Sequence, residues 1–284
     1  MRITSEKIKK VAAIHASCGY GRASLGIVTP ILSSMGVQVC PVPTSVLSSH
    51  TGFENVSFVD LTETLKEYFE QWKNLNLEFN CLYSGFLSSS KQIDAISHYI
   101  NHIKNDNTLI VIDPVMGDSG NLYRTINEKL LENMKNYIKL ADIITPNYTE
   151  AAFLLNKEYN KDISLEEIKK WTIALSELGP KYVVITSVPD NNNNYTNIVL
   201  YNKISNEFYN KRIKKIPISF PGTGDAFTSI LIGCILRGIN FKEAIIISSD
   251  FLSKVIKESY KANLPTKEGI LIEKYLPELN EKIQ

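Results

Sequence analysis

Hydrophobic positions fall into short, nearly continuous runs, separated by longer stretches in which apolar and polar residues mix. The runs cover residues 11–15, 37–42, 81–83, 108–112, 143–144 and 182–186. A run without alternation is typical of a strand that is covered on both faces, as in a parallel sheet. Because the runs alternate with helical stretches, the pattern predicts a βαβ-type α/β fold. No linker or internal repeat interrupts it, so we expect residues 1–284 to form a single domain.

The mixed stretches carry the spacing and the end signals of helices. One begins after Asp60-Leu-Thr-Glu63, which resembles a capping box, and its apolar positions recur at intervals close to four residues. Further helices are expected at residues 24–35, 91–103, 164–178, 224–236 and 241–257. An antiparallel hairpin is expected at 198–201 and 207–213. Pro41 and Pro43 predict that the second strand ends there and that a loop follows as far as Gly52.

Composition narrows the class of protein. The chain has 31 Lys and Arg against 30 Asp and Glu, so its charge favours neither nucleic acid nor an anionic membrane as a partner. The four cysteines form no close pair, which favours a reducing compartment without disulfides or structural zinc. His98 and His102 lack a third ligand nearby and favour a surface or packing role. Residues 1–10 are polar and precede no apolar signal segment, so we expect a cytoplasmic protein.

Pro221-Gly-Thr-Gly-Asp225 carries the strongest local signal for chemistry. Its glycines allow a tight turn, and the helix that follows has a partly positive N-terminus, so the segment can bind an anion such as a phosphoryl group. A carboxylate at Asp225 could then accept a proton from an attacking hydroxyl. The structural alternative is a turn in which the glycines and Asp225 only cap the helix.

Two further acidic segments follow predicted strands. Asp113-Pro-Val-Met-Gly-Asp118 could hold Mg²⁺ through its two carboxylates, or it could simply form a turn. Asn147 and Glu150 could serve a nucleotide site, or they could form a capping box. Together with Thr186 and Ser187, these residues lie at the carboxyl ends of predicted strands, where ligands bind in doubly wound sheets. That agreement favours function.

Two common nucleotide motifs are missing. Gly19-Tyr-Gly21 lacks the third glycine of a dinucleotide fingerprint, because Ser24 occupies its place. No Walker A segment occurs anywhere in the chain. A kinase of this sequence would therefore not be a P-loop enzyme.

Taken together, the segments resemble the ribokinase-like superfamily and, within it, the pyridoxal kinases. The resemblance runs from about Val11 to Lys257. It is carried by Gly19-Tyr-Gly-Arg22, Val39-Cys-Pro-Val-Pro-Thr44, Ser48-Ser-His-Thr-Gly52, Ser84-Gly-Phe86, Asp113 to Asp118, Asp142 to Asn147 with Glu150, Val184 to Ser187, and Gly222-Thr-Gly-Asp225. It implies a three-layer α/β/α sandwich with a mostly parallel central sheet. It also implies phosphorylation of the primary alcohol of a B6 vitamer by ATP, with Mg²⁺, a monovalent cation such as K⁺, and a homodimer.

The resemblance also implies residue roles. Asp225 is expected to be the base, with Gly222, Thr223 and Gly224 as the anion hole. Asp113, Asp118 and Glu150 are expected around the metal. ATP contacts are expected from Asp113, Asn147, Glu150, Thr186, Ser187 and Tyr123. Vitamer contacts are expected from Ala16, Thr44, His50, Phe86 and Asp225.

Two positions depart from the family pattern. Ala16 stands where relatives usually carry a polar residue, and Phe86 stands where the stacking ring is often Tyr. Both concern the identity of the substrate rather than the phosphoryl chemistry. A hydroxymethylpyrimidine kinase therefore stays open as an alternative, as does a non-catalytic protein that binds a B6 vitamer or a nucleotide.

Overall fold

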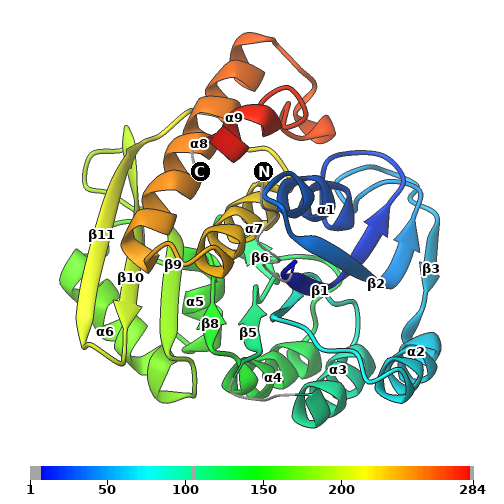
Figure 1. The fold of residues 1–284 in the computed structure, drawn as a ribbon. Coiled ribbons are helices and arrows are strands. Elements are labelled where there is room, and N and C mark those ends of the chain that lie inside the picture. Colours follow the sequence, from blue (N-terminus) through cyan, green and yellow to red (C-terminus); the bar gives the residue numbers. More distant parts are fainter. Residues whose placement is uncertain (1–7, 104–106, 282–284) are drawn as a thin grey trace, which may run out of the picture.

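A computed structural model describes residues 8–103 and 107–281. Within them, nine strands form one sheet in the order β11-β10-β9-β8-β5-β4-β1-β2-β3 (Figure 1). The strands are β1 (Lys10–Cys18), β2 (Gln38–Leu47), β3 (Phe58–Asp60), β4 (Cys81–Ser84), β5 (Leu109–Ile112), β8 (Ile143–Ile144), β9 (Tyr182–Pro189), β10 (Tyr195–Asn202) and β11 (Glu207–Lys214). The six from β2 to β9 in this order run parallel, and antiparallel strands border them at both edges. A small separate hairpin pairs β6 (Gly117–Asp118) with β7 (Asn121–Leu122).

Helices cover both faces of the sheet, which gives the three layers expected (Figure 1). One face carries α1 (Leu25–Ser34), α7 (Thr223–Leu236), α8 (Phe241–Lys261) and α9 (Leu276–Glu281). The other carries α2 (Thr62–Asn74), α3 (Ser90–Ile103), α4 (Glu128–Tyr137), α5 (Tyr148–Leu154) and α6 (Leu165–Glu177). Short 3₁₀ turns lie at Ile138–Leu140 and Thr266–Glu268. The predicted α/β/α architecture is confirmed.

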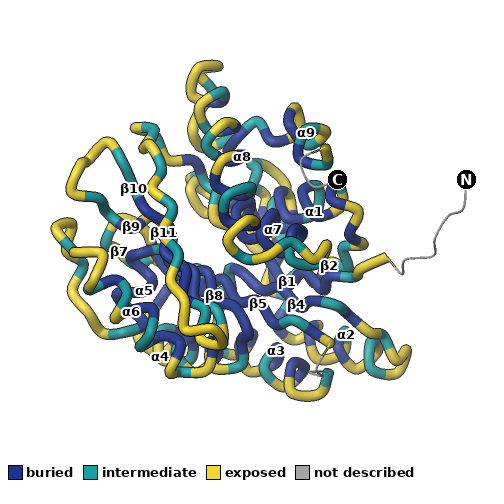
Figure 2. The backbone as a smooth tube through the Cα atoms, turned by 60° about the vertical axis from the view of Figure 1, so that its left-hand side comes forward, coloured by how far each residue is buried: buried dark blue, intermediate teal, exposed yellow. Residues whose placement is uncertain are grey.

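The central strands are apolar on both sides because both sides face helices. In β1, Val11 and Ala13 join the cluster packed under α1, whereas Ala12 and Ile14 join the cluster on the opposite face. All four side chains are fully buried. The middle of the sheet is accordingly the most buried part of the backbone (Figure 2). The unbroken apolar runs in the sequence therefore reflect burial on two faces.

The prediction that Pro41 and Pro43 end the second strand was wrong, because β2 continues to Leu47. Both prolines remain in register with β1. Their missing N–H groups lie two residues apart and so on the same side of the strand. β3 pairs only with Ser45 to Leu47, so that side has no partner strand at the prolines. Proline is tolerated at such an edge.

Two helix boundaries also differ from the prediction. The Asp60–Glu63 capping box does not form, because α2 begins at Thr62 and Asp60 Oδ1 accepts a hydrogen bond from the Thr62 N–H at 2.6 Å. Helix α8 continues to Lys261 rather than ending at Lys257.

Other expectations concern the chain as a whole. No helix among the described residues combines the length and the apolar character needed to span a membrane. Cys18, Cys40, Cys81 and Cys234 are free thiols. Residues 1–7 of the polar N-terminal segment lie outside the described residues, and the single-domain assignment stays a prediction.

Candidate active site

The Gly-rich segment begins helix α7 as predicted. Gly222 is the N-cap and has φ 78°, in the left-handed region that favours glycine. A Cβ there would lie 2.1 Å from the backbone oxygen of Arg22, so steric contact demands glycine as well. The first N–H groups of a helix have no acceptor within the helix, and they carry its positive dipole end. The segment therefore has the geometry that an anion site needs, and its role as one stays a prediction.

Asp225 lies in the first turn of this helix with only 11% of its side chain exposed. Its Oδ2 accepts a hydrogen bond from the backbone N–H of Ser24 at 2.9 Å, so it does not act as a simple cap of its own helix. Burial raises the pKa of Asp225 to about 6, and the Ser24 hydrogen bond partly opposes that rise. A carboxyl with this pKa is mostly ionised at neutral pH and can accept a proton.

The Asp113–Asp118 segment folds back against this helix. Asp113 follows β5, is buried, and has its Oδ2 only 3.7 Å from the place a Cβ on Gly224 would occupy. The β6–β7 hairpin explains Gly117, where a Cβ would lie 2.3 Å from the Asn121 carbonyl oxygen. Burial, together with the charges of Glu150 and Asp225, raises the pKa of Asp113 well above its usual range. Asp113 thus lies within the electrostatic reach of both other acids.

Glu150 and Asn147 form the capping box that the sequence allowed as an alternative. Glu150 Oε2 accepts from the Asn147 N–H at 2.8 Å, and Oε1 accepts from the Met116 N–H at 3.0 Å. Asn147 Nδ2 also donates to the Gly117 carbonyl at 2.8 Å. The box therefore ties α5 to the turn after β5. Asn147 and Glu150 thus have this structural role in addition to the nucleotide-site role expected of them.

The acidic side chains of this region are candidate ligands for Mg²⁺. Burial raises the pKa of Glu150 to about 8, and a nearby cation would relieve the repulsion among Glu150, Asp113 and Asp225. Among the described residues, no three His, Cys, Asp or Glu side chains form a group able to hold a metal ion. Mg²⁺ commonly takes one or two carboxylates and completes its shell with phosphate oxygens and water. Asp113 fits a direct ligand best, because both Glu150 oxygens already accept backbone hydrogen bonds.

Thr186 and Ser187 reach the site through a bulge. Ile185 pairs with Val199 and Val188 pairs with Asn197, so these two residues together oppose Ile198 alone. Ser187 has φ 56°, which a non-glycine residue adopts only when its surroundings enforce it. Bulges redirect side chains next to functional sites.

These segments line one cavity of about 480 Å³. It brings together eleven residues predicted from the sequence: Asp113, Asp118, Tyr123, Asn147, Glu150, Thr186, Ser187, Gly222, Thr223, Gly224 and Asp225. Lys214 and Lys215 also line it, together with Ile216 and Ser219. The predicted residues converge from the carboxyl ends of β5, β8 and β9 and from the N-terminus of α7.

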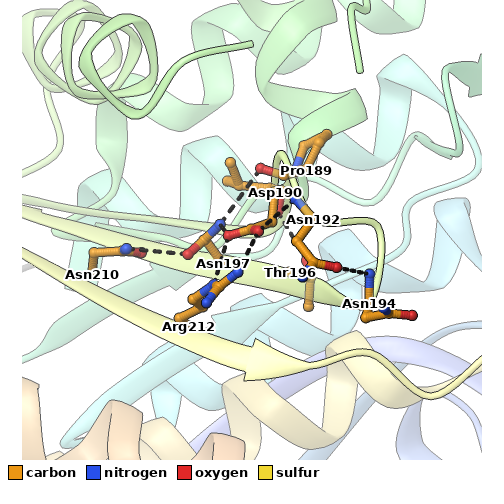
Figure 3. Close-up of polar contacts among 9 residues, drawn as sticks. Pro189, Asp190, Asn192, Asn194, Thr196, Asn197, Asn210 and Arg212 are labelled. Carbon is orange, nitrogen blue, oxygen red and sulfur yellow. Dashed lines mark hydrogen bonds and ion pairs between the residues drawn. The ribbon is translucent and has the colours of Figure 1, made fainter. Parts of the chain in front are cut away.

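The β9–β10–β11 edge supports one wall of this cavity. Next to the cavity-lining pair Thr196 and Ile213, Arg212 donates to both carboxylate oxygens of Asp190, at 2.9 and 2.8 Å (Figure 3). Asn197 also donates to Asp190, at 3.1 Å, and Asn210 donates to Asn197 (Figure 3). The Arg212 hydrogen bonds lower the pKa of Asp190, so the network stays charged at neutral pH. It joins all three strands just before the chain enters residues 214–221.

Apart from Asp225, the residues expected to contact a vitamer do not line this cavity, and three of them lie on or next to neighbouring strands. Ala16 is near the end of β1, Thr44 lies on β2, and Phe86 follows β4. Thr44 is fully buried, and its Oγ1 has no hydrogen-bond partner in the part of the chain that the structure describes. Gly85, next to Phe86, would place a Cβ 3.4 Å from Asp225 Oδ1. Asp225 therefore lies where the two groups of residues meet.

His50 is held by local contacts instead. Its Nε2 lies 2.6 Å from the carbonyl oxygen of Lys267, and its Nδ1 accepts from the Gly52 N–H at 3.1 Å. Arg22 binds the same C-terminal segment, through Glu273 at 2.7 Å and through a backbone hydrogen bond to Glu268. We call these contacts the C-terminal clamp. Since both His50 nitrogens are engaged, its expected contact with a substrate stays a prediction.

Two features near the base were not foreseen. His15 Nδ1 lies 3.7 Å from Asp225 Oδ1, and the backbone of Ser24, at φ 51°, is turned so that its N–H meets the same carboxylate. The available signal for His15 was a polar residue at the end of an otherwise apolar run. Ser24 offered none, because any residue can donate a backbone N–H.

Comparisons with known proteins agree with this geometry. A family model described as phosphomethylpyrimidine kinase matches residues 31–269. A Bacteroides thetaiotaomicron protein, provisionally assigned as a phosphomethylpyrimidine kinase and crystallised with pyridoxal, superimposes with a TM-score of 0.94 at 40% identity, covering 96% of each chain. Pyridoxal kinase from Lactobacillus plantarum superimposes with a TM-score of 0.88 at 26% identity, covering 98% of each chain. The hydroxymethylpyrimidine/phosphomethylpyrimidine kinase of Aquifex aeolicus is 31% identical over 70% of this chain and 73% of its own.

The family model covers most of the chain, and the predicted resemblance to pyridoxal kinases is confirmed. The chain belongs to the phosphomethylpyrimidine kinase family, and its relatives include pyridoxal kinases.

Proposed function

We propose that this protein transfers the γ-phosphoryl group of ATP to the 5′-hydroxymethyl group of pyridoxal, pyridoxamine or pyridoxine. The observation that carries the proposal is the position of Asp225. It lies beside the anion site of α7, borders the cavity lined by the nucleotide-type residues, and faces Gly85 on the side of the expected vitamer residues. One carboxylate thus adjoins both substrates.

The residues suggest a direct transfer. Asp225 accepts the proton of the vitamer hydroxyl as the hydroxyl oxygen bonds to the γ-phosphorus. The bond between that phosphorus and the β,γ-bridging oxygen breaks, and ADP leaves. The N–H groups at Gly222, Thr223 and Gly224 stabilise the charge on the moving phosphoryl group. When bound, Mg²⁺ would neutralise phosphate charge, and Asp113, Asp118 and Glu150, which line the cavity, are the residues proposed to hold or orient it.

ATP would occupy the cavity of about 480 Å³. Asn147, Thr186, Ser187 and Tyr123 are the proposed contacts for ATP. Pocket-lining Lys214 and Lys215 place positive charge near a site that otherwise presents carboxylates, which favours a polyanionic ligand.

The vitamer would lie in the other half of the site, against Ala16, Thr44 and Phe86. Thr44 Oγ1, which has no hydrogen-bond partner among the described residues, suits a polar substituent on a ring, and Phe86 offers an apolar face for stacking. The pyridoxal bound to the Bacteroides relative supports this choice of substrate. His50 would act only by holding the loop that closes this half.

The second candidate is a hydroxymethylpyrimidine kinase, which the family model and the Aquifex relative favour. Both reactions phosphorylate a hydroxymethyl group on a flat ring and would use the same base. The Ala16 position, next to Thr44 on the adjoining strand, is where ring substituents would be distinguished.

The test is ADP formation by the purified protein with Mg²⁺ and ATP. Pyridoxal, pyridoxamine, pyridoxine, hydroxymethylpyrimidine and ribose are supplied separately. Turnover with a B6 vitamer is the expected result. Turnover with hydroxymethylpyrimidine alone would keep the mechanism and support the second candidate function. Tight vitamer binding without turnover would support the non-catalytic alternative.

The same preparation tests the remaining proposals. EDTA should abolish turnover and Mg²⁺ should restore it, and replacing K⁺ with a large organic cation should lower it. Sedimentation should give a homodimer. We also propose a cytoplasmic location, which cell fractionation would test.

A further inference from the structure

His15 is a fully buried histidine at the end of β1. Neither Nδ1 nor Nε2 has a hydrogen-bond partner in the part of the chain that the structure describes. Burying a polar group without a hydrogen-bond partner destabilises a protein. Leucine or phenylalanine could occupy a packing position without that penalty. The imidazole therefore calls for a role that an apolar side chain cannot fill.

The surroundings hold the ring in one place. Its edge packs on Tyr83, with ring centroids 4.4 Å apart and an interplanar angle of 72°. A Cβ on Gly85 would lie 2.5 Å from two atoms of the ring, so glycine at position 85 leaves the space that the ring fills. The ring is thus fixed from two sides and directed at a third.

That third side is the proposed base. His15 Nδ1 lies 3.7 Å from Asp225 Oδ1, whereas Asp225 Oδ2 accepts the Ser24 N–H at 2.9 Å. The two oxygens of one carboxylate therefore face two different nitrogen atoms, one a backbone amide and one an imidazole. A carboxylate held at both oxygens has a fixed plane, and the direction of its remaining lone pairs is fixed as well.

The ring is suited to this task because it is neutral. Burial lowers the pKa of His15 to about 3, so it carries no charge at neutral pH. A positive charge beside Asp225 would lower the pKa of the carboxyl and weaken it as a base. A neutral imidazole still donates one hydrogen bond, from whichever nitrogen is protonated.

We propose that His15 is a positioning residue for Asp225, donating a hydrogen bond from Nδ1–H to Oδ1 and fixing the carboxylate toward the substrate hydroxyl. The separation of 3.7 Å shortens to about 2.9 Å in the reactive complex, since catalytic hydrogen bonds are often long before substrates bind. The proton taken from the alcohol stays on Asp225. The role of Asp225 as a base rests on the proposed function, whereas the hydrogen bond between His15 and Asp225 does not.

Steady-state kinetics test the positioning role. His15→Leu removes the donor and should lower kcat about tenfold, the equivalent of one hydrogen bond to a charged group. KM for ATP and for the vitamer should change by less than about twofold, because neither substrate loses a contact. His15→Asn restores a donor near the Nδ1 position and should recover most of the lost kcat. Val11→Ala, on the same face of β1 and fully buried, should lower stability and leave kcat unchanged.

Equal kcat losses in His15→Leu and His15→Asn would overturn the proposal, as would a loss confined to KM. Thermal unfolding of each variant shows whether it is folded at the assay temperature.

Nitrogen-15 NMR of the imidazoles tests the hydrogen bond without any substrate. The chain has four histidines, and His15→Asn identifies the signals of His15 by their loss. We expect a neutral ring protonated on Nδ1 in the wild type. In Asp225→Asn, the Ser24 N–H needs the amide oxygen as its acceptor, so the amide NH₂ faces His15 and the ring should become protonated on Nε2. The same tautomer in both proteins would overturn the proposal. The expected tautomers in a protein that phosphorylates no vitamer would instead refute the proposed function alone.

Discussion

Replacing the proposed base should make the protein less active and more stable. Asp225→Asn removes a carboxylate whose charged form is disfavoured by burial, and the amide can keep the Ser24 hydrogen bond. Active sites commonly hold groups in environments that reduce stability in exchange for function. A loss of activity combined with a gain in stability would therefore identify Asp225 as a functional acid rather than a structural cap.

The magnitude follows from the shift in pKa. The pKa of about 6 in the folded protein exceeds the ordinary value of 3.8, so the folded state binds the proton more tightly than the unfolded chain. The resulting penalty is absent below pH 3.8, grows as pH rises toward 6, and is complete above it. It amounts to about 3 kcal/mol at pH 8 and about half of that at pH 5. Asp225→Asn should be more stable than the wild type by these amounts.

The assay is urea unfolding of both ligand-free proteins at pH 5 and pH 8, together with turnover at pH 7. Loss of a general base should lower kcat by roughly 100- to 10,000-fold. Asp250→Asn is the matched control, because it makes the same change in an exposed carboxylate on α8 and should alter neither quantity strongly. A variant that is less stable than the wild type at pH 8, or whose gain does not shrink at pH 5, would refute the reasoning.

Three further predictions concern the rest of the site. Ala16→Ser should change KM for pyridoxal, pyridoxamine and pyridoxine by different factors while leaving KM for ATP unchanged, and equal factors in initial-rate assays would contradict a role for position 16 in substrate choice. Gly222→Ala should lower kcat at least tenfold and lower the unfolding temperature, because its Cβ would meet the Arg22 carbonyl oxygen at 2.1 Å. Gly238→Ala is its control, with φ 83° and no atom within 4 Å of the new Cβ, and should only destabilise, by about 1–2 kcal/mol. Most of residues 214–221 line the cavity, and this segment would close over the bound substrates, so its hydrogen exchange should slow when ATP and a vitamer are both bound. Unchanged exchange, measured by mass spectrometry, would exclude this closure.

The layered fold could be predicted because a strand that is buried on both faces appears in the sequence as an unbroken apolar run. A strand such as β1 has apolar residues on both sides, so helices must cover both sides. The Gly-rich turn before α7 could be predicted as well, because the φ angle at position 222 requires glycine. Local geometry determines both features.

Features that depend on distant parts of the chain escaped the prediction. Nothing near His15 in the sequence indicates that Asp225, more than 200 residues away, would lie beside it. The continuation of β2 through Pro41 depends on which edge of the strand is unpaired, and that depends on where β3 begins. The capping box at Asp60 failed because the helix started one residue later than its signal. Such details follow from tertiary packing, which outweighs local preference.

The C-terminal clamp has a consequence for biosynthesis. Chains are made from the N-terminus, and domains generally begin to fold in that order. Arg22 and His50 are synthesised long before their partners, which lie more than 200 residues later in the chain, in residues 267–273. A nascent chain can therefore form much of the sheet before the proposed vitamer half of the site is closed. Chains truncated after Pro265 lack these partners and should bind vitamer poorly, so such a truncation would act as a loss of function.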